Sequence, residues 1–257
     1  ACHAADIGAN DRLLTTPNTF IATAGAGIHY RTTPIFIDID RSTGNVDLEE
    51  LKPNLNIPSS RGRTVVIPVH FSGLPVDMQL LDRMIKNPDT IVIEDAAHAF
   101  GSSYKDGQKI GCCAWSLMTM FSFHPAKTIT TGEGGLITTN DPEVFRRLKR
   151  FRNNGIERDP QYLEDAAAPW YYEVQEITNN YNFTEMQAAL GLSQLSKIDS
   201  FIEKRRELVR SYRNELKDTP HVRLFTDELD SHTAFHLFVV QIDYEALKTT
   251  RKDVMEA

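Results

Sequence analysis

Cysteine is scarce in this sequence, and long hydrophobic runs are missing. Its 257 residues include three cysteines, Cys2, Cys112 and Cys113, and no Cys-x-x-Cys spacing. An odd number of cysteines, two of them adjacent, argues against a disulfide framework or a zinc site and favours a reducing compartment, so we expect a cytoplasmic location. No stretch reaches about 18 consecutive apolar residues, so we expect no membrane span.

An excess of positive charge is also lacking. The chain has 28 Lys and Arg against 35 Asp and Glu, which gives a formal net charge of -7. A nucleic-acid-binding protein needs a basic face, and the one basic cluster, residues 146–152, follows a helical pattern that is typical of a solvated surface. We therefore expect no nucleic-acid partner.

Several familiar catalytic motifs do not occur. The sequence contains no G-x-G-x-x-G after a strand-like run, no G-x-x-x-x-G-K-[ST] and no G-x-S-x-G. The sequence therefore gives no support for a dinucleotide or ATP site of the usual kind, or for the nucleophile turn of a serine hydrolase. His221, His232 and His236 have no spacing that is typical of metal ligands, so we predict no metal.

Short strand-like runs alternate with helical ones along the chain. Val, Ile and Phe dominate most of these runs, and Pro, Gly, Asn or Asp bound them. The expected strands are Arg12–Thr15, Ile35–Asp38, Thr64–Val69, Thr90–Glu94, Trp115–Phe121 and Gly135–Thr139. Near-continuous apolar strands separated by helices predict an α/β fold with a mainly parallel sheet covered on both faces.

Helix signals are clearest in the second half of the chain. Asp141-Pro142-Glu143 starts a helix that Asn154-Gly155 ends, and Thr184 to Gln187 fits a capping box. The pattern behind that box predicts one long helix to about Leu216, which could bridge two domains. We expect a large domain over 1–200 and the start of a smaller, truncated α/β domain over 201–257, with strands at His221–Phe225 and His236–Ile242.

Three strand ends carry residues that could do chemistry. Asp95 follows an apolar run, Ser122 and Lys127 follow the next, and Phe20 lies in a segment after the first. Taken singly, Asp95 could be a helix cap, Lys127 a surface lysine and Phe20 a core residue. Taken together, an amine, a carboxylate for a ring nitrogen, a flat face for stacking and a hydroxyl for a phosphate match the needs of pyridoxal phosphate.

Ordered segments along nearly the whole chain resemble the DegT/DnrJ/EryC1/StrS family of sugar aminotransferases. They include PNTFIATAGAGIHYRTTPIFIDID, VIEDAAHAFGSSYKDGQKIG, FSFHPAKTITTGEGG and FTEMQAALGLSQLSKID. The resemblance implies the fold-type I architecture of pyridoxal phosphate enzymes: a mainly parallel mixed sheet flanked by helices. It also implies that Lys127 is the Schiff-base lysine, Asp95 the partner of the pyridine nitrogen and Phe20 the stacking ring. His98 would lie near the ring oxygen of the cofactor and Ser122 near its phosphate.

Other roles that the resemblance implies involve a second subunit and the substrate. Asn182 or Asn180 would reach the phosphate in the partner subunit, so a homodimer is implied; this region reads Thr178-Asn179-Asn180-Tyr181-Asn182, unlike the Gly-Tyr-Asn-Tyr-Arg-like run of most relatives. The substrate side would include four residues, His124, Trp170, Tyr171 and Arg158, for which local packing or solvation is the alternative.

The implied reaction is transamination of a nucleotide-linked 4-keto-6-deoxy sugar, with glutamate as amino donor. FSFHPAKTITTGEGG followed by PWYYEVQE resembles the branch that aminates a UDP-linked hexosamine for pseudaminic acid synthesis. Alternatives are a sugar of the perosamine or 4-amino-arabinose type, a non-catalytic family member, or a sugar dehydratase, against which Lys127 counts. The opening ACHAADIGANDRLL reads like the tail of a helix and suggests a fragment, for which we expect weak cofactor binding and little activity.

Overall fold

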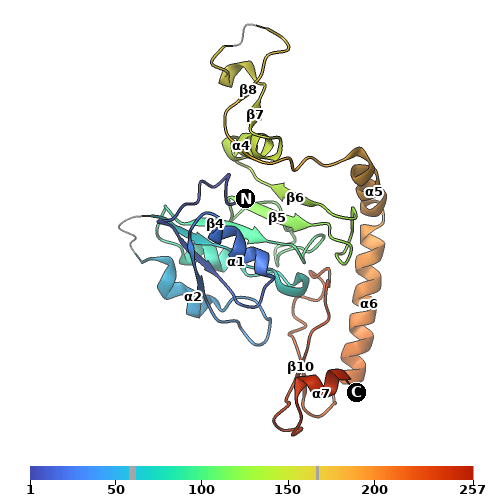
Figure 1. Ribbon diagram of the computed structural model, residues 1–257. Coiled ribbons are helices and arrows are strands. Elements are labelled where there is room, and N and C mark those ends of the chain that lie inside the picture. Colours follow the sequence, from blue (N-terminus) through green and yellow to red (C-terminus); the bar gives the residue numbers. More distant parts are fainter. Residues whose placement is uncertain (58–61, 166–167, 257) are drawn as a thin grey trace.

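A six-stranded sheet forms the body of the computed structural model, which describes residues 1–57, 62–165 and 168–256 (Figure 1). The strand order is β2-β1-β3-β4-β5-β6, and all neighbours are parallel except β5 and β6. The strands are β1 Arg12–Thr15, β2 Thr33–Phe36, β3 Thr64–Val66, β4 Ile91–Asp95, β5 Met118–Ser122 and β6 Gly135–Thr138. The predicted mainly parallel, mixed sheet is confirmed.

Alternation along the strands fills two cores, one on each face of the sheet. Leu14, Val66 and Val92 belong to one buried cluster, while their neighbours Leu13 and Val65 belong to the other. Side chains one residue apart point to opposite faces of a strand, so a continuous apolar run serves both cores at once. The first core also includes residues of α2 Leu48–Leu55 and α3 Met78–Met84, and the second takes Val144 from α4 Pro142–Arg152.

Proline explains two strand ends that differ from the prediction. β2 begins at Thr33 and not at Ile35, because an edge strand tolerates a residue such as Pro34 that has no N–H. β3 ends at Val66, two residues before Pro68, instead of running to Val69. β5 covers Met118–Ser122 and so begins later than the predicted start at Trp115. The side chain of Trp115 packs against the first core.

The long helix predicted from the capping box is two helices, α5 Glu185–Leu195 and α6 Ile198–Leu216. The box itself is present, with Thr184 and Gln187 bonding reciprocally. The helix is interrupted at Ser196 and Lys197, and the Ser196 hydroxyl donates to the carbonyl of Ser193. The apolar spacing runs on across the break, so periodicity alone could not reveal it.

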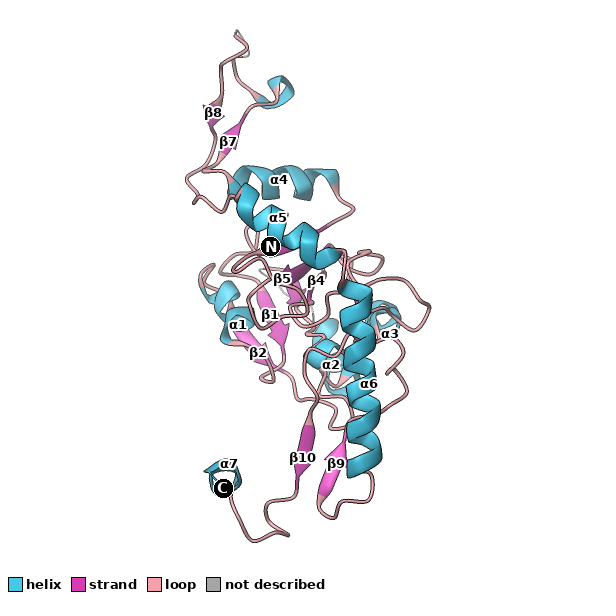
Figure 2. Cartoon of the chain, turned by 90° about the vertical axis from the view of Figure 1, so that its right-hand side faces the viewer, coloured by secondary structure: helices cyan, strands magenta, loops and turns pink. Residues whose placement is uncertain are grey.

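Two smaller pairs of strands extend from the body. An arm, residues 156–174, carries β7 Ile156–Glu157 and β8 Glu173–Val174 and projects beyond α4 (Figure 1). At the opposite end, β9 Val222–Leu224 pairs with β10 Val240–Ile242, and α6 runs along the side of the body toward them (Figure 2). The remaining elements are α1 Ile21–Ile28, α7 Arg251–Glu256 and the 3-10 turns Phe71–Gly73 and Pro160–Tyr162. The boundary predicted at residue 200 falls within α6 and stays a prediction.

No described helix has the length and apolar content needed to cross a membrane.

Candidate active site

The carboxyl ends of β4 and β5 lie side by side and bring the candidate residues together. β4 ends at Asp95 and β5 at Ser122, and the two strands pair in parallel, with Asp95 opposite Met120. Open α/β sheets bind their ligands at this edge. The loop after β5 carries Lys127, and α1 begins directly after Phe20.

Asp95 is a buried carboxylate with only part of its bonding capacity used. Its Oδ2 accepts a hydrogen bond of 2.6 Å from Thr23 Oγ1, and its Oδ1 accepts one of 3.1 Å from the backbone N–H of Ala97. Residues 96–100 form a turn and no helix, so Asp95 is not the helix cap that its position after a strand could indicate. Its bond to Thr23 ties α1 to the end of β4.

Lys127 is half-buried, and its surroundings disfavour the ammonium form. Burial lowers the pKa of its side chain, and the attraction of Asp95 opposes this shift only in part. The charge of Lys127 also lowers the pKa of His98, so Lys127 interacts electrostatically with both Asp95 and His98. An amine with a lowered pKa is available as a nucleophile and as a base.

His98 meets a second histidine that the sequence did not single out. The rings of His98 and His236 lie 4.4 Å apart with 41° between their planes. Burial, reinforced by Lys127, lowers the pKa of His98 to about 3 and that of His236 to about 4, so both rings are neutral near pH 7. His236 reaches this place from the segment after α6, and no local spacing in the sequence marks it.

Phe20 and Ser122 flank this centre without being part of the core. Phe20 is 73% exposed at the N-terminus of α1, so the expectation of a core phenylalanine is wrong and its ring face is free to stack. Ser122 is partly buried, and its hydroxyl oxygen accepts from the backbone N–H of His124 at 3.3 Å. A lysine amine, a buried carboxylate, an open aromatic ring and a hydroxyl at one sheet edge fit the donor set that pyridoxal phosphate needs.

Of the remaining predicted residues, one lies on the Lys127 loop and three lie in the arm. His124 is exposed on the Lys127 loop, close enough for its charge to act on His236. Arg158, Trp170 and Tyr171 all lie in the arm, where Trp170 is 79% exposed and the Arg158 guanidinium stacks 4.8 Å from the ring centre of Tyr172.

Asn180 and Asn182 lie where the arm returns to α5. The side-chain amide of Asn182 donates to Asn153 Oδ1 at 2.9 Å, and Asn180 pairs with Asn153 through a β-bridge. Figure 1 shows the arm extending beyond α4 and away from β4.

A second carboxylate, Glu94, lies next to Asp95 in β4 but faces the other way. It is 0% exposed, and its oxygens accept from four donors, His70 Nε2, Tyr104 Oη, Ser116 Oγ and Thr119 Oγ1. These bonds outweigh the effect of burial and keep the pKa of Glu94 below its usual value. His70 is fixed in turn, because its Nδ1 accepts from the N–H of Val76 at 3.0 Å.

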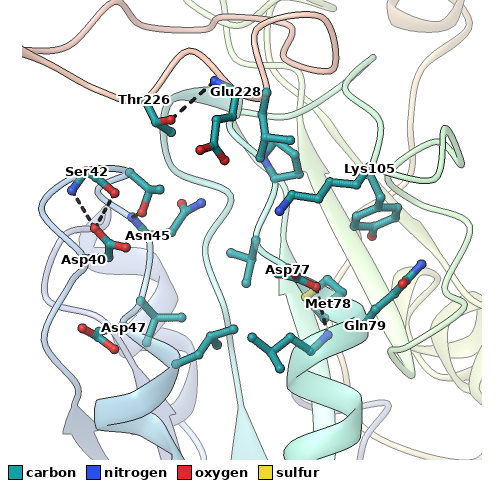
Figure 3. Close-up of a pocket in the computed structure, with 18 of the residues that line it drawn as sticks. Asp40, Ser42, Asn45, Asp47, Asp77, Met78, Gln79, Lys105, Thr226 and Glu228 are labelled. Carbon is teal, nitrogen blue, oxygen red and sulfur yellow. Dashed lines mark hydrogen bonds between the residues drawn. The ribbon is translucent and has the colours of Figure 1, made fainter.

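A cavity of about 590 Å³ opens elsewhere, between α2, α3 and residues 226–229 (Figure 3). Three of its acidic residues are used within the fold: Asp47 and Asp77 cap α2 and α3, and Asp40 accepts from Ser42. Asp95 and Lys127 do not line this cavity, so we do not place the chemistry there.

The whole chain, residues 1–257, matches the model of the DegT/DnrJ/EryC1/StrS aminotransferase family. The chain belongs to this family. The resemblance read from its ordered segments is thereby confirmed, and so is the expected fold.

Curated and solved relatives agree with this assignment. The chain is 38% identical to an uncharacterized protein, MJ1066, of Methanocaldococcus jannaschii over 98% of its own length and 64% of that protein. It is 34% identical to the spore coat polysaccharide biosynthesis protein SpsC of Bacillus subtilis, over 100% of its length and 64% of that relative. Helicobacter pylori PseC, an aminotransferase involved in the biosynthesis of pseudoaminic acid, superposes with a TM-score of 0.82 at 30% identity, over 95% of this chain and 61% of PseC.

The family also settles the cofactor. Membership in it, together with its solved neighbours, confirms the prediction of pyridoxal phosphate. The chain spans 64% of the length of the two curated relatives.

Proposed function

We propose that the protein transfers an amino group from glutamate to the keto carbon of a nucleotide-linked 4-keto-6-deoxy sugar, UDP-linked, during glycan biosynthesis in the cytoplasm. The half-buried Lys127 amine beside the buried Asp95 carboxylate is the observation that carries this proposal. The names of PseC and SpsC, which place those relatives in pseudoaminic acid and spore coat polysaccharide biosynthesis, support a sugar substrate.

Each residue at the sheet edge has a distinct task in this proposal. Pyridoxal phosphate, when bound, supplies an electron sink for the charge that develops at the reacting carbon. Asp95 would hold the proton of the ring nitrogen, and Phe20 would cover one ring face. Ser122 would donate its hydroxyl hydrogen to the phosphate, and His98 would contact the ring oxygen. Lys127 would hold the cofactor through Nζ; once the amine of the amino donor has displaced it, the free Lys127 amine would act as the base that moves the proton from the substrate carbon.

A homodimer would complete the site. Arg158, Trp170 and Tyr171 lie on the arm, which points away from β4 in Figure 1, and a second copy would bring these side chains to the site. Exposed apolar residues on α1 and α5, among them Ile21, Met186 and Leu192, supply a surface for that copy to cover. Asn180 or Asn182 would then reach the partner's phosphate site. Mixing Lys127→Ala subunits with Arg158→Ala subunits tests this, because restored turnover requires a shared site.

Substrate trials on the full-length protein test the reaction itself. UDP- and dTDP-linked 4-keto-6-deoxy sugars would be incubated with glutamate, and the products identified by NMR. We expect amination of a UDP-linked 4-keto-6-deoxy sugar. The same trials would include the keto-sugar precursors of perosamine and 4-amino-arabinose, and amination of one of these alone would correct the substrate.

The lysine gives the decisive control. Lys127→Ala should abolish both the visible absorbance of the bound cofactor and the turnover, whereas Lys105→Ala, an exposed lysine, should change neither. Unchanged turnover in Lys127→Ala would refute the proposed function.

A further inference from the structure

The main chain around His236 is fixed to the body of the protein. The His236 N–H donates to the carbonyl of Ser72 at 2.8 Å, and Arg205 donates to the carbonyl of Phe235 at 2.9 Å. Ser102 Oγ accepts from the N–H of Ala234 at 2.9 Å. Backbone contacts therefore determine where the imidazole of His236 lies, and the ring itself is not used for anchoring.

A strained turn holds both histidines at once. Ser72 is buried and has a φ of 59°, in the left-handed region that a serine rarely adopts. Its N–H donates to His98 Nδ1 at 3.3 Å, while its carbonyl accepts from His236. Strain of this kind persists only where surrounding contacts impose it, and it concentrates at functional sites.

One nitrogen of the His236 ring has no use within the chain. His236 Nδ1 is buried and finds no hydrogen-bond partner among the residues that the structure describes. Buried polar atoms are nearly always paired, so an orphan of this kind calls for a ligand. Burial, and after it the basic side chains Lys127, Arg205 and His124, lower the pKa of His236, so that its ring is neutral near pH 7. A neutral imidazole nitrogen bonds an oxygen atom as donor, or a hydroxyl as acceptor.

We propose that His236 Nδ1 binds an oxygen of the substrate that reacts at Lys127. The inference rests on the proposed function, since it assumes a substrate at this centre. The residues assigned to the cofactor are Asp95, His98, Phe20 and Ser122. His236 Nδ1 is a further polar atom that the cofactor does not use. The oxygen belongs either to the sugar or to the carboxylate of the amino donor, and both offer the same hydrogen-bonding chemistry.

Two amide variants separate the two ring nitrogens. Asparagine places its amide near the position of Nδ1, and glutamine near that of Nε2. Full-length protein loaded with cofactor would be titrated calorimetrically with L-glutamate and, separately, with UDP-N-acetylglucosamine as a sugar probe. We expect His236→Gln to raise the Kd of one probe by about 10-fold, the loss of one hydrogen bond, and His236→Asn to stay within about 3-fold of the wild type. The probe that is affected identifies the source of the oxygen.

His232 supplies a matched control from the same segment. Its Nδ1 is already paired with Ser103 Oγ at 3.1 Å, so His232→Gln should leave both Kd values unchanged. The visible absorbance and the affinity of the cofactor should be the same in all three variants, which a general structural defect would not allow.

Three results would overturn the inference: equal Kd values for His236→Gln and the wild type, equal losses in the Asn and Gln variants, or no measurable binding of either probe to the wild type. The titrations need no turnover. Failure of the wild type on the sugar panel would therefore refute the proposed function without deciding this point.

Discussion

Glu94 and Asp95 are adjacent acids on one strand, and their surroundings differ in how fully each carboxylate is bonded. Glu94, on one face of the sheet, accepts from four side-chain donors and is fully buried. Asp95, on the other face, accepts from Thr23 and the N–H of Ala97 and lies close to Lys127. Both are acids at the end of β4, so residue type and position do not distinguish them. Asp95 differs from Glu94 because its carboxylate can still accept further hydrogen bonds.

A saturated carboxylate can only stabilise the fold, whereas an unsaturated one can take a ligand. Glu94 joins His70 after β3, Tyr104 after β4, and Ser116 and Thr119 at β5. It therefore ties the end of β4, which carries Asp95, to the start of β5. We therefore expect Glu94 to stabilise the fold and Asp95 to take part in the chemistry, and single substitutions can test these two roles.

The largest expected effect is on turnover in Asp95→Asn. The amide keeps the size of the carboxylate but cannot carry the negative charge that holds a ring proton, so we expect turnover to fall roughly 10³-fold. The thermal unfolding temperature should fall only modestly, because the amide oxygen can still accept from Thr23 although the bond from the N–H of Ala97 is lost. Turnover within a few-fold of wild type would remove Asp95 from the chemistry.

Glu94→Gln should show the reverse pattern. Four hydrogen bonds to a charged acceptor become neutral and some donors lose their partner, so we expect the free energy of unfolding to fall by about 2 kcal/mol. Turnover per folded molecule should stay close to wild type. The measurement is urea unfolding together with kinetics at a temperature where both proteins are folded. A stable Glu94→Gln protein with low turnover would contradict the division of roles.

Lowering the pH should have a smaller effect, on protein stability, through the two histidines on the Asp95 side of the sheet. The folded pKa values of His98 and His236, about 3 and about 4, lie below the value of 6.5 for an ordinary histidine. Between pH 6.5 and about 4 the unfolded chain binds more protons at these groups, so stability falls as pH falls. Allowing for solvent screening, we expect each ring to account for about 1 kcal/mol between pH 7 and pH 5.

Lys127 acts on both rings, His236 acts on His98, and Arg205 and His124 act on His236; all of these groups are basic and lower the pKa in the same direction as burial. Urea unfolding of the wild type and His236→Asn at both pH values measures the effect. We expect a smaller loss of stability in the variant. An identical pH dependence would show that His236 is protonated equally in the folded and unfolded protein.

The sequence predicted those parts of the fold and site that local patterns encode. Apolar runs located the six strands of the main sheet, and the position of Asp95 after such a run put it at a strand end. Tertiary context shifted the start of β2, where Pro34 is accommodated on an edge strand, and the break between α5 and α6 has no signal in the apolar spacing. The Ala- and Gly-rich α1 went unpredicted, since small residues carry no helical hydrophobic period.

Tertiary contacts account for what could not be predicted in the site. The four donors around Glu94 come from separate loops and strands, and the pairing of His98 with His236 depends on the left-handed Ser72. No spacing along the chain encodes either arrangement.

The attachment of the His236 segment has a consequence for the order of folding. Its bond from Ala234 to Ser102 joins residues 132 positions apart, whereas Asp95 and Thr23 are 72 apart and neighbouring strands pair over shorter spans. Closing a longer loop costs more chain entropy before its contacts repay it, and such contacts form late. We therefore expect the sheet edge with Asp95 and Lys127 to assemble first and His236 to arrive last, so that the substrate-binding nitrogen is the final part of the site to mature.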